Sequence, residues 1–135
     1  YLYNLTTANK DGVQTTGNGY KGGSGIGIRA INVAIKPGKV SEEEMLNKVG
    51  NGVYITSLSG LHSGMNAQSG NFSLIAQGFM IRDGKLAEPL SLITVAGNLF
   101  DVFNNVAVVA NNNELQTNSY SVPSIFVKSI QVSGK

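Results

Sequence analysis

Hydrophobic and polar residues alternate most clearly over residues 70–89, and this pattern predicts a long β-hairpin. Asp83-Gly84 is a favoured pair for a two-residue type I′ turn, because both central residues of that turn need positive φ. Gly78 leaves a gap in the first arm and Pro89 lies roughly opposite, so we expect a bulge or an edge there. The alternation places Phe72, Leu74, Ala76 and Met80 on one face and Ser73, Ile75, Gln77, Phe79 and Ile81 on the other.

Helical signals occur at two places. Ser41 and Glu44 form a capping box, which predicts a helix over residues 41–49 that Gly50 or Gly52 closes. Asn98 can cap a second short helix over residues 99–104, with Asp101 exposed near its positive end. These two helices are the only ones that the pattern predicts.

The other hydrophobic runs predict strands, and the polar runs between them predict loops. Strands are expected over residues 1–8, 26–35, 52–58, 106–110 and 123–132, and loops over residues 14–27, 59–70 and 111–121. We therefore expect a mainly β fold, a barrel- or sandwich-like antiparallel or mixed sheet domain with two short helices. Residues 1–135 have the length of a single domain.

Composition narrows the function classes. The ten basic residues are scattered and the net charge is only +2, so direct nucleic-acid binding is not expected. The chain has no cysteine, which excludes disulfides and thiolate metal sites and fits a cytoplasmic location. No apolar run approaches the ~20 residues that cross a bilayer, so no membrane span is expected. Because the chain starts at Tyr1, we expect it to be part of a longer protein.

A glycine-rich segment matches the spacing G-x-G-x-x-G at Gly17, Gly19 and Gly22. A dinucleotide site would need a strand before this motif and a helix after it, and the sequence predicts a loop and a strand instead. Two interpretations are kept: a loop whose glycines adopt unusual backbone angles, and a loop that becomes ordered on a partner or a substrate.

The sole histidine, His62, lies in a polar segment. One histidine cannot supply the pair of imidazoles that most protease zinc sites use, and carboxylates are scattered along the chain. A serine triad with His62 and Asp101 lacks a Gly-x-Ser-x-Gly elbow. We therefore predict no catalytic or metal-ligating residue in this chain. His62 is interpreted either as a solvated side chain or as a residue that contacts a ligand.

Several segments, taken in order, resemble the C-terminal domain of the TldD/PmbA family, also named modulators of DNA gyrase. The similarity rests on their order and spacing across nearly the whole chain. The segments are Thr15-Thr-Gly-Asn18, Asn32-Val-Ala-Ile-Lys-Pro-Gly38, the helix at Ser41, Gly52-Val-Tyr-Ile-Thr-Ser-Leu-Ser-Gly60, Ser69-Gly-Asn-Phe-Ser73, the hairpin over residues 81–89, Ala96-Gly-Asn-Leu-Phe100 and residues 123–134.

This resemblance implies a function that the residues alone do not. TldD and PmbA (TldE) chains form a two-subunit zinc peptidase that acts on unfolded polypeptides. TldD-type chains carry a His-Glu-x-x-x-His helix, and their C-terminal domain adds a cysteine ligand from the loop before the last strand. Here that loop, residues 111–121, has no cysteine. The resemblance therefore implies the C-terminal domain of a PmbA-like, metal-free subunit, with zinc in a TldD-like partner.

Three hypotheses follow. The leading one is a supporting subunit of the peptidase, associated with a TldD-like chain or with itself, in which Asn71 and Ser73 line a groove for an extended peptide. The second is a β-rich module that binds a peptide or a protein and has no role in proteolysis. The third is a free-standing hydrolase that uses His62.

Overall fold

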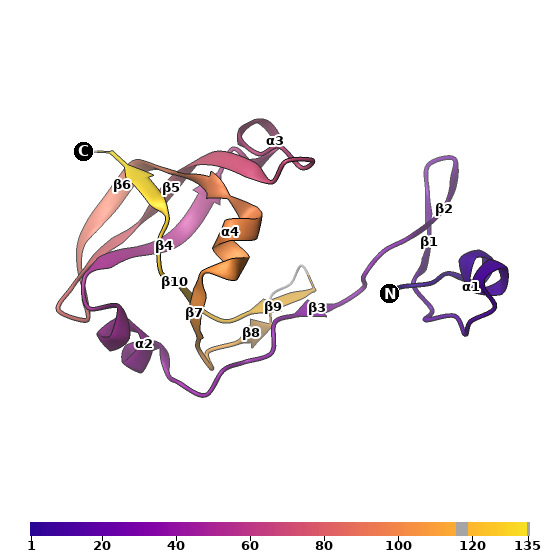
Figure 1. The fold of residues 1–135 in the computed structure, drawn as a ribbon, viewed down its shortest axis with the longest axis horizontal. Helices are drawn as coiled ribbons and strands as arrows, with labels where there is room; N and C mark the ends of the chain where they lie inside the picture. The colour runs from indigo at the N-terminus through magenta and orange to yellow at the C-terminus, as the bar shows by residue number, and fades with distance from the viewer. Residues whose placement is uncertain (116–118, 135) are drawn as a thin grey trace. The chain divides into compact units, whose positions relative to one another are not determined.

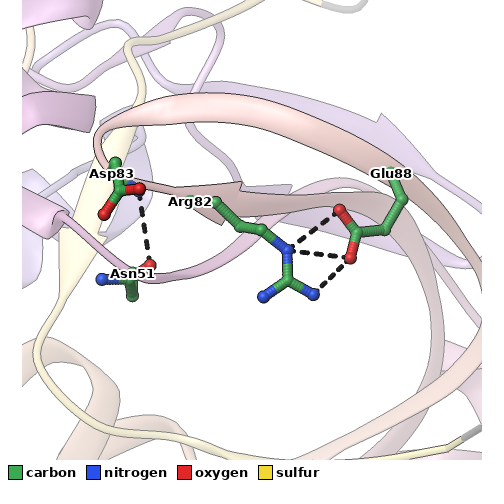
Figure 2. Close-up of polar contacts among 4 residues, drawn as sticks. All are labelled: Asn51, Arg82, Asp83 and Glu88. Carbon is green, nitrogen blue, oxygen red and sulfur yellow. Dashed lines mark hydrogen bonds and ion pairs between the residues drawn. The ribbon is translucent and has the colours of Figure 1, made fainter.

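The computed structural model describes residues 1–115 and 119–134, and its longest element is the hairpin of β5 (Asn71–Arg82) and β6 (Lys85–Asn98). Asp83 and Gly84 have φ angles of 48° and 75°, which confirms the predicted turn. Figure 2 shows how the tip is held: the Arg82 guanidinium forms a forked ion pair with Glu88, and the Asp83 N–H donates to Asn51 Oδ1 at 3.3 Å.

The hairpin is the centre of a four-stranded antiparallel sheet. Its order is β11 (Gln131–Ser133), β6, β5 and β4 (Gly52–Ser59), which confirms the predicted strand at residues 52–58. One face of the sheet carries the hydrophobic core, in which Ala76, Ile93 and Val95 are buried. Figure 1 shows β4, β5 and β6 as neighbouring curved strands.

Gly78 sets the path of the two strands beside it. A Cβ on Gly78 would lie 1.8 Å from the Tyr54 carbonyl oxygen, so only glycine permits this approach. Bulges surround the contact: β4 gains a residue between Ile55 and Ser57, and the β5–β6 register shifts between Ala76 and Gly78. The predicted bulge is thus confirmed.

Burial along β5 does not stay on one of its two predicted faces. A second register shift of the β5–β6 pair lies between Phe79 and Ile81, and its extra residue belongs to β6. Leu74 and Ala76 are buried as expected, but further along Ile81 is buried and Met80 only half-buried. The pairing of β5 with β4 stays regular from Gly78 to Ile81, so the β5 side chains keep alternating there. Ile81 is buried on the opposite face, where it lines a cavity together with residues of the helix over Glu42–Val49.

Helices lie at both ends of the hairpin (Figure 1). At the turn end is α2 (Glu42–Val49), with the predicted capping box of Ser41 and Glu44 and with Gly50 as its C-cap. At the other end are α3 (Leu61–Gly64) and α4 (Leu99–Asn104), the latter capped by Asn98 as predicted. A short antiparallel pair, β7 (Val106–Val109) with β10 (Ile125–Val127), belongs to the same compact unit.

That unit comprises Lys36–Asn113 and the chain from Pro123 onward, and a second unit comprises Tyr1–Ile35 and Glu114–Val122. The second unit contains α1 (Leu5–Asp11) and the antiparallel pair β1 (Gly19–Gly22) and β2 (Gly25–Ile28). It also contains β3 (Val33–Ala34), which pairs in parallel with β9 (Tyr120–Val122), and β8 (Glu114–Leu115), which pairs with β9.

The predicted strand over residues 1–8 is wrong, because α1 begins there. The Asn4 side chain accepts from the Thr7 N–H at 2.8 Å, and the Thr7 hydroxyl accepts from the Asn4 N–H at 3.2 Å. Gly12 ends the helix at a φ of 67°. This reciprocal cap satisfies N–H groups that a helix start leaves unpaired, and it outweighs the strand preference of Tyr1-Leu2-Tyr3.

Other boundaries also differ from the predictions. The predicted loop over residues 14–27 contains the β1–β2 hairpin, the predicted strand over residues 26–35 is split between β2 and β3, and the predicted loop over residues 59–70 contains α3. The predicted final strand is two strands, β10 and β11, in different sheets. The predicted loop over residues 111–121 holds β8 and the start of β9, and residues 116–118 lie outside the described residues.

The prediction of a mainly β fold is confirmed, and that of two helices is wrong, since the described part of the chain contains four. Its sheets are open rather than closed, so a barrel is not supported, whereas a sandwich-like arrangement remains compatible with them. That residues 1–135 make a single domain stays a prediction.

Replacing Gly78 by alanine is expected to lower the free energy of unfolding by about 1–3 kcal/mol, because the new methyl group overlaps the Tyr54 carbonyl. Urea denaturation measures the change. Gly25→Ala is the matched control, since a Cβ there meets no atom within 4 Å. Equal effects of the two substitutions would contradict the packing argument.

The Glu88 carboxyl is expected to titrate at a pKa of about 2, because the Arg82 guanidinium binds its ionised form. A carbon-detected NMR titration of this side chain measures the value. Arg82→Ala should raise the pKa toward the ordinary value of 4.5, with only the smaller lowering by a backbone hydrogen bond left, and Lys85→Ala should leave it low. A low Glu88 pKa that survives Arg82→Ala would assign the shift to another cause.

Candidate functional site

A shallow groove of about 440 Å³ lies where α3 meets the start of β5. Two of the predicted contact residues, Asn71 and Ser73, line it together. The approach is close, because a Cβ on Gly64 would lie 2.3 Å from the Ser73 carbonyl oxygen. The remaining lining residues are Ser63, Gly64, Met65, Asn66 and Phe72.

The loop between α3 and β5 is fixed by Asn66. Its Oδ1 accepts from the N–H groups of Gln68 and Ser69, both at 3.0 Å. Its backbone N–H donates to the Asn71 carbonyl at 2.9 Å, and its carbonyl accepts from the Gly70 N–H at 2.8 Å. Such asparagine turns hold a tight loop without a buried core, so the groove wall is preorganised.

Asn71 and Ser73 differ in their roles. The Asn71 Oδ1 accepts from Asn98 Nδ2 at 2.8 Å, and the Asn98 Oδ1 caps α4 by accepting from the Phe100 N–H at 2.9 Å. Asn71 therefore helps to position α4. Among the described residues, the Ser73 hydroxyl has no hydrogen-bond partner, so it is available to a molecule in the groove.

His62 lies in α3, directly before the groove residue Ser63, but it does not line the groove. Its side chain is exposed, and none of the described residues hydrogen-bonds to it. Asp101 is exposed in the first turn of α4, as predicted. No hydrogen bond joins these two side chains in the described part of the chain, so the geometry does not support a triad built on His62.

Gly17, Gly19 and Gly22 lie in the other compact unit, and packing explains two of them. A Cβ on Gly22 would lie 2.1 Å from the Tyr20 hydroxyl, because the Tyr20 ring covers that glycine. Arg29 stacks over the same ring at 4.7 Å from its centroid. Gly19 faces Asn4, and Gly17 has a φ of 71°. The second half of the motif forms β1, and strand β2 follows it instead of a helix, which argues against a dinucleotide site.

A polar network that the sequence analysis missed joins α2, β4 and Ser124, the residue directly before β10. Glu42 Oε1 accepts hydrogen bonds from the Tyr54 hydroxyl and from Ser124 Oγ, the latter at 2.7 Å. Asn112 and Ser124 form a reciprocal pair: Asn112 Nδ2 donates to Ser124 Oγ and the Ser124 N–H donates to Asn112 Oδ1, both at 2.9 Å. Glu42 and Ser124 are 82 residues apart in sequence, so no local signal could have found them.

These contacts shift two pKa values in opposite directions. The Tyr54 hydroxyl, followed by Ser124, lowers the pKa of Glu42, because both donate to its ionised form. The same carboxylate raises the pKa of Tyr54, because it holds the phenolic proton. At neutral pH the network therefore contains an ionised carboxylate and a neutral phenol.

The donor groups in this chain do not fit a zinc site. Zinc in proteins takes three or four ligands from cysteine, histidine and carboxylate side chains. The sequence has one histidine and no cysteine, and the described residues contain no group of three or more His, Asp or Glu side chains that could hold a metal ion. Separately, none of the helices in the described part of the chain is long and apolar enough to cross a membrane.

Comparison with known proteins gives concordant results. A family model described as the PmbA/TldA metallopeptidase C-terminal domain matches residues 1–134. The metalloprotease PmbA of Escherichia coli O157:H7 is 32% identical over 135 residues, covering 100% of this chain and 28% of the relative. The chain thus spans little more than a quarter of the length of the curated relatives that it matches first.

Two crystal structures share the fold. A Thermotoga maritima protein, named as a candidate modulator of a DNA gyrase, superposes with a TM-score of 0.86 at 38% identity, covering 98% of this chain and 30% of that one. The TldE protein of Thermococcus kodakarensis superposes with a TM-score of 0.84 at 25% identity, covering 99% of this chain and 31% of that one.

Glu42→Gln is expected to lower the free energy of unfolding by about 1 kcal/mol at pH 7, a value reduced by the partial exposure of the site. Because folding lowers the pKa of Glu42, its ionised form stabilises the fold above the ordinary value of 4.5. This contribution is lost as the pH falls below 4.5, through the lower pKa of the folded state. The difference between the variant and the wild type should therefore shrink under acid conditions.

Urea denaturation between pH 3 and 7 measures both curves. Glu43→Gln is the matched control, because it removes an exposed charge from the same first helical turn without touching the network. A pH-independent difference for Glu42→Gln, or an equal loss in the control, would contradict the role given to the Tyr54 and Ser124 hydrogen bonds.

Proposed function

Since the chain belongs to the PmbA/TldD family of metallopeptidases, through the C-terminal domain of that family, we propose that it is part of a PmbA-like, metal-free subunit. This subunit acts in the cytoplasm beside a TldD-like partner that carries the catalytic zinc. Together the two subunits cleave unfolded or extended polypeptides, and this chain helps to hold the substrate.

The chemistry of the available side chains supports the assignment of zinc to the partner. Three protein ligands and an open position are the usual requirement of a catalytic zinc. His62 is the sole imidazole in the chain, it is exposed, and it has no carboxylate partner among the described residues. The similarity to chains named PmbA and TldE points to the same subunit type.

The observation that carries the proposed role in substrate binding is the uncharged groove between α3 and the start of β5. Every residue that lines the groove is uncharged. In the described part of the chain, β4 has a strand on one side only, so its other edge offers unpaired backbone groups. An extended chain of any sequence can hydrogen-bond to such an edge, and an uncharged groove places no charge requirement on its side chains.

The sheet around the groove has the same character. The stretches 56–59, 71–77, 94–98 and 131–133, which lie side by side in β4, β5, β6 and β11, contain no charged residue. Depletion of charge is typical of the buried centre of protein interfaces. This surface is therefore suited to neutral contacts with a substrate or with the partner subunit.

The experiment is reconstitution of the full-length protein with the TldD-like chain of the same genome. Co-elution, zinc content and chelator-sensitive cleavage of an unfolded peptide are expected from the mixture, with no cleavage by this subunit alone. Absence of association and of cleavage would overturn the proposal and favour a binding module without a role in proteolysis. Cleavage by this subunit alone that His62→Ala abolishes would favour the free-standing hydrolase.

Within that complex, Ser73→Tyr should fill the groove and raise KM for an unfolded peptide about tenfold, with kcat little changed, because only uniform substrate binding is lost. Ser73 is a better probe than Asn71, whose replacement would also disturb the cap of α4. Ser133→Tyr adds the same bulk at an exposed position of the sheet outside the groove and should have no effect. Equal kinetics for all three proteins would remove the groove from the substrate path.

A further inference from the structure

A second hollow lies in the unit that contains the hairpin, and the proposed peptidase role does not use it. It measures about 540 Å³ and lies between α2, the first half of β4 and the segment 124–130. Its lining residues are Met45, Leu46, Val49, Asn51, Gly52, Val53, Tyr54, Ile55, Ile81, Ser124, Ile125, Phe126, Val127, Lys128, Ser129, Ile130 and Val132. None of them lines the groove at α3.

The cavity is open to solvent on one side, where the lining residues Asn51, Lys128, Ser129 and Val132 are exposed. Its volume of about 540 Å³ is that of a ligand site. Pockets for small molecules usually measure about 300–1,000 Å³ and have mainly apolar walls. The walls here are mostly aliphatic, with Phe126 as their one phenylalanine.

Three residues with hydroxyl groups line the cavity: Tyr54, Ser124 and Ser129. Ser129 is exposed next to Lys128, and the hydroxyl groups of the other two are already engaged. The Tyr54 hydroxyl and Ser124 Oγ both donate to Glu42, and Ser124 Oγ also accepts from Asn112. A ligand therefore needs no polar group to satisfy the hydroxyl groups of Tyr54 and Ser124. An apolar chain fits the part of the cavity around Tyr54 and Ser124, because it would bury aliphatic surface and leave neither of these two hydroxyl groups unpaired.

Lys128 gives the cavity its one charge. It is the single charged residue among those that line the cavity, and it is exposed. Within the described residues no carboxylate pairs with it, since the one ion pair there joins Arg82 and Glu88. An apolar cavity with one unpaired cation at an exposed position is complementary to a chain that ends in an anion.

We propose that this cavity binds an aliphatic carboxylate, with the hydrocarbon chain between α2, β4 and the segment 124–130 and the carboxylate at Lys128. The ligand is a free small molecule, and its binding is independent of cleavage by the complex. The cavity thus gives this subunit a ligand site of its own.

The test uses the full-length protein and decanoate, below its micellar concentration, in isothermal titration calorimetry. Decanoate is expected to bind with one-to-one stoichiometry, and decylamine and decanol about tenfold or more weakly, because they lack the anion. Absence of saturable decanoate binding, or equal binding of decylamine, would overturn the proposal. Binding of apolar peptides without binding of decanoate would also overturn it.

Two substitutions locate the site. Lys128→Gln should weaken decanoate about tenfold and remove the preference for decanoate over decanol, whereas Lys85→Gln at the hairpin tip should change neither. Leu46→Trp should fill the cavity and abolish binding, with Ile75→Trp on the exposed face of β5 as the control of equal bulk. Decanoate binding that survives both Lys128→Gln and Leu46→Trp would place the ligand elsewhere.

A measurement on the wild type covers the case in which Leu46→Trp fails to fold. A spin-labelled fatty acid should broaden the NMR methyl signals of Ile55, Ile125 and Ile130, which line the cavity, and spare that of Ile75. Uniform broadening of all four signals, or none, would contradict the site. Because none of these readouts involves peptide cleavage, failure here and failure of the proposed peptidase role are distinguishable.

Discussion

The approach of the Tyr54 carbonyl to Gly78 is the constraint on which the rest of the larger unit depends. It lies next to the extra residue in β4, which divides that strand into two halves with different surroundings. The first half lines the apolar cavity and presents the Tyr54 hydroxyl to Glu42. The second half is exposed, uncharged and ends at α3, beside the groove. One glycine therefore allows a single sheet to border two separate hollows.

Elements with a complete local signal were predictable from the sequence. The helix α2 has its capping box and a closing glycine within ten residues, the type I′ turn needs only Asp83-Gly84, and α4 needs only the Asn98 cap. The start of α1 carried a similar signal in Asn4 and Thr7, but the aromatic residues before it have the stronger preference for strands. Local rules thus succeed where the deciding contacts lie within one or two turns, and fail where two such rules compete.

The candidate sites were predictable only in part. Asn71 and Ser73 line one groove, because they belong to one face of one strand, and their contact with a peptide stays a prediction. That Asn71 is already bound to Asn98 follows from strand pairing, which the sequence does not specify. The network of Glu42, Tyr54 and Ser124 joins three distant segments, and its residue types are ordinary helix-start, strand and loop residues. Long-range packing, and not any local pattern, creates both that network and the cavity beside it.

The reciprocal pair of Asn112 and Ser124 has a consequence for how the chain can be shortened. It joins the two ends of the segment that carries β8 and β9. This segment therefore resembles an inserted loop, whose length can change while the hydrogen bonds between its two ends are kept. Because β9 pairs with β3, however, the smaller unit is built from two separate stretches of chain. Removal of residues 1–35 alone would leave β9 without its parallel neighbour β3. To separate the two units cleanly, both stretches of the smaller unit must be removed.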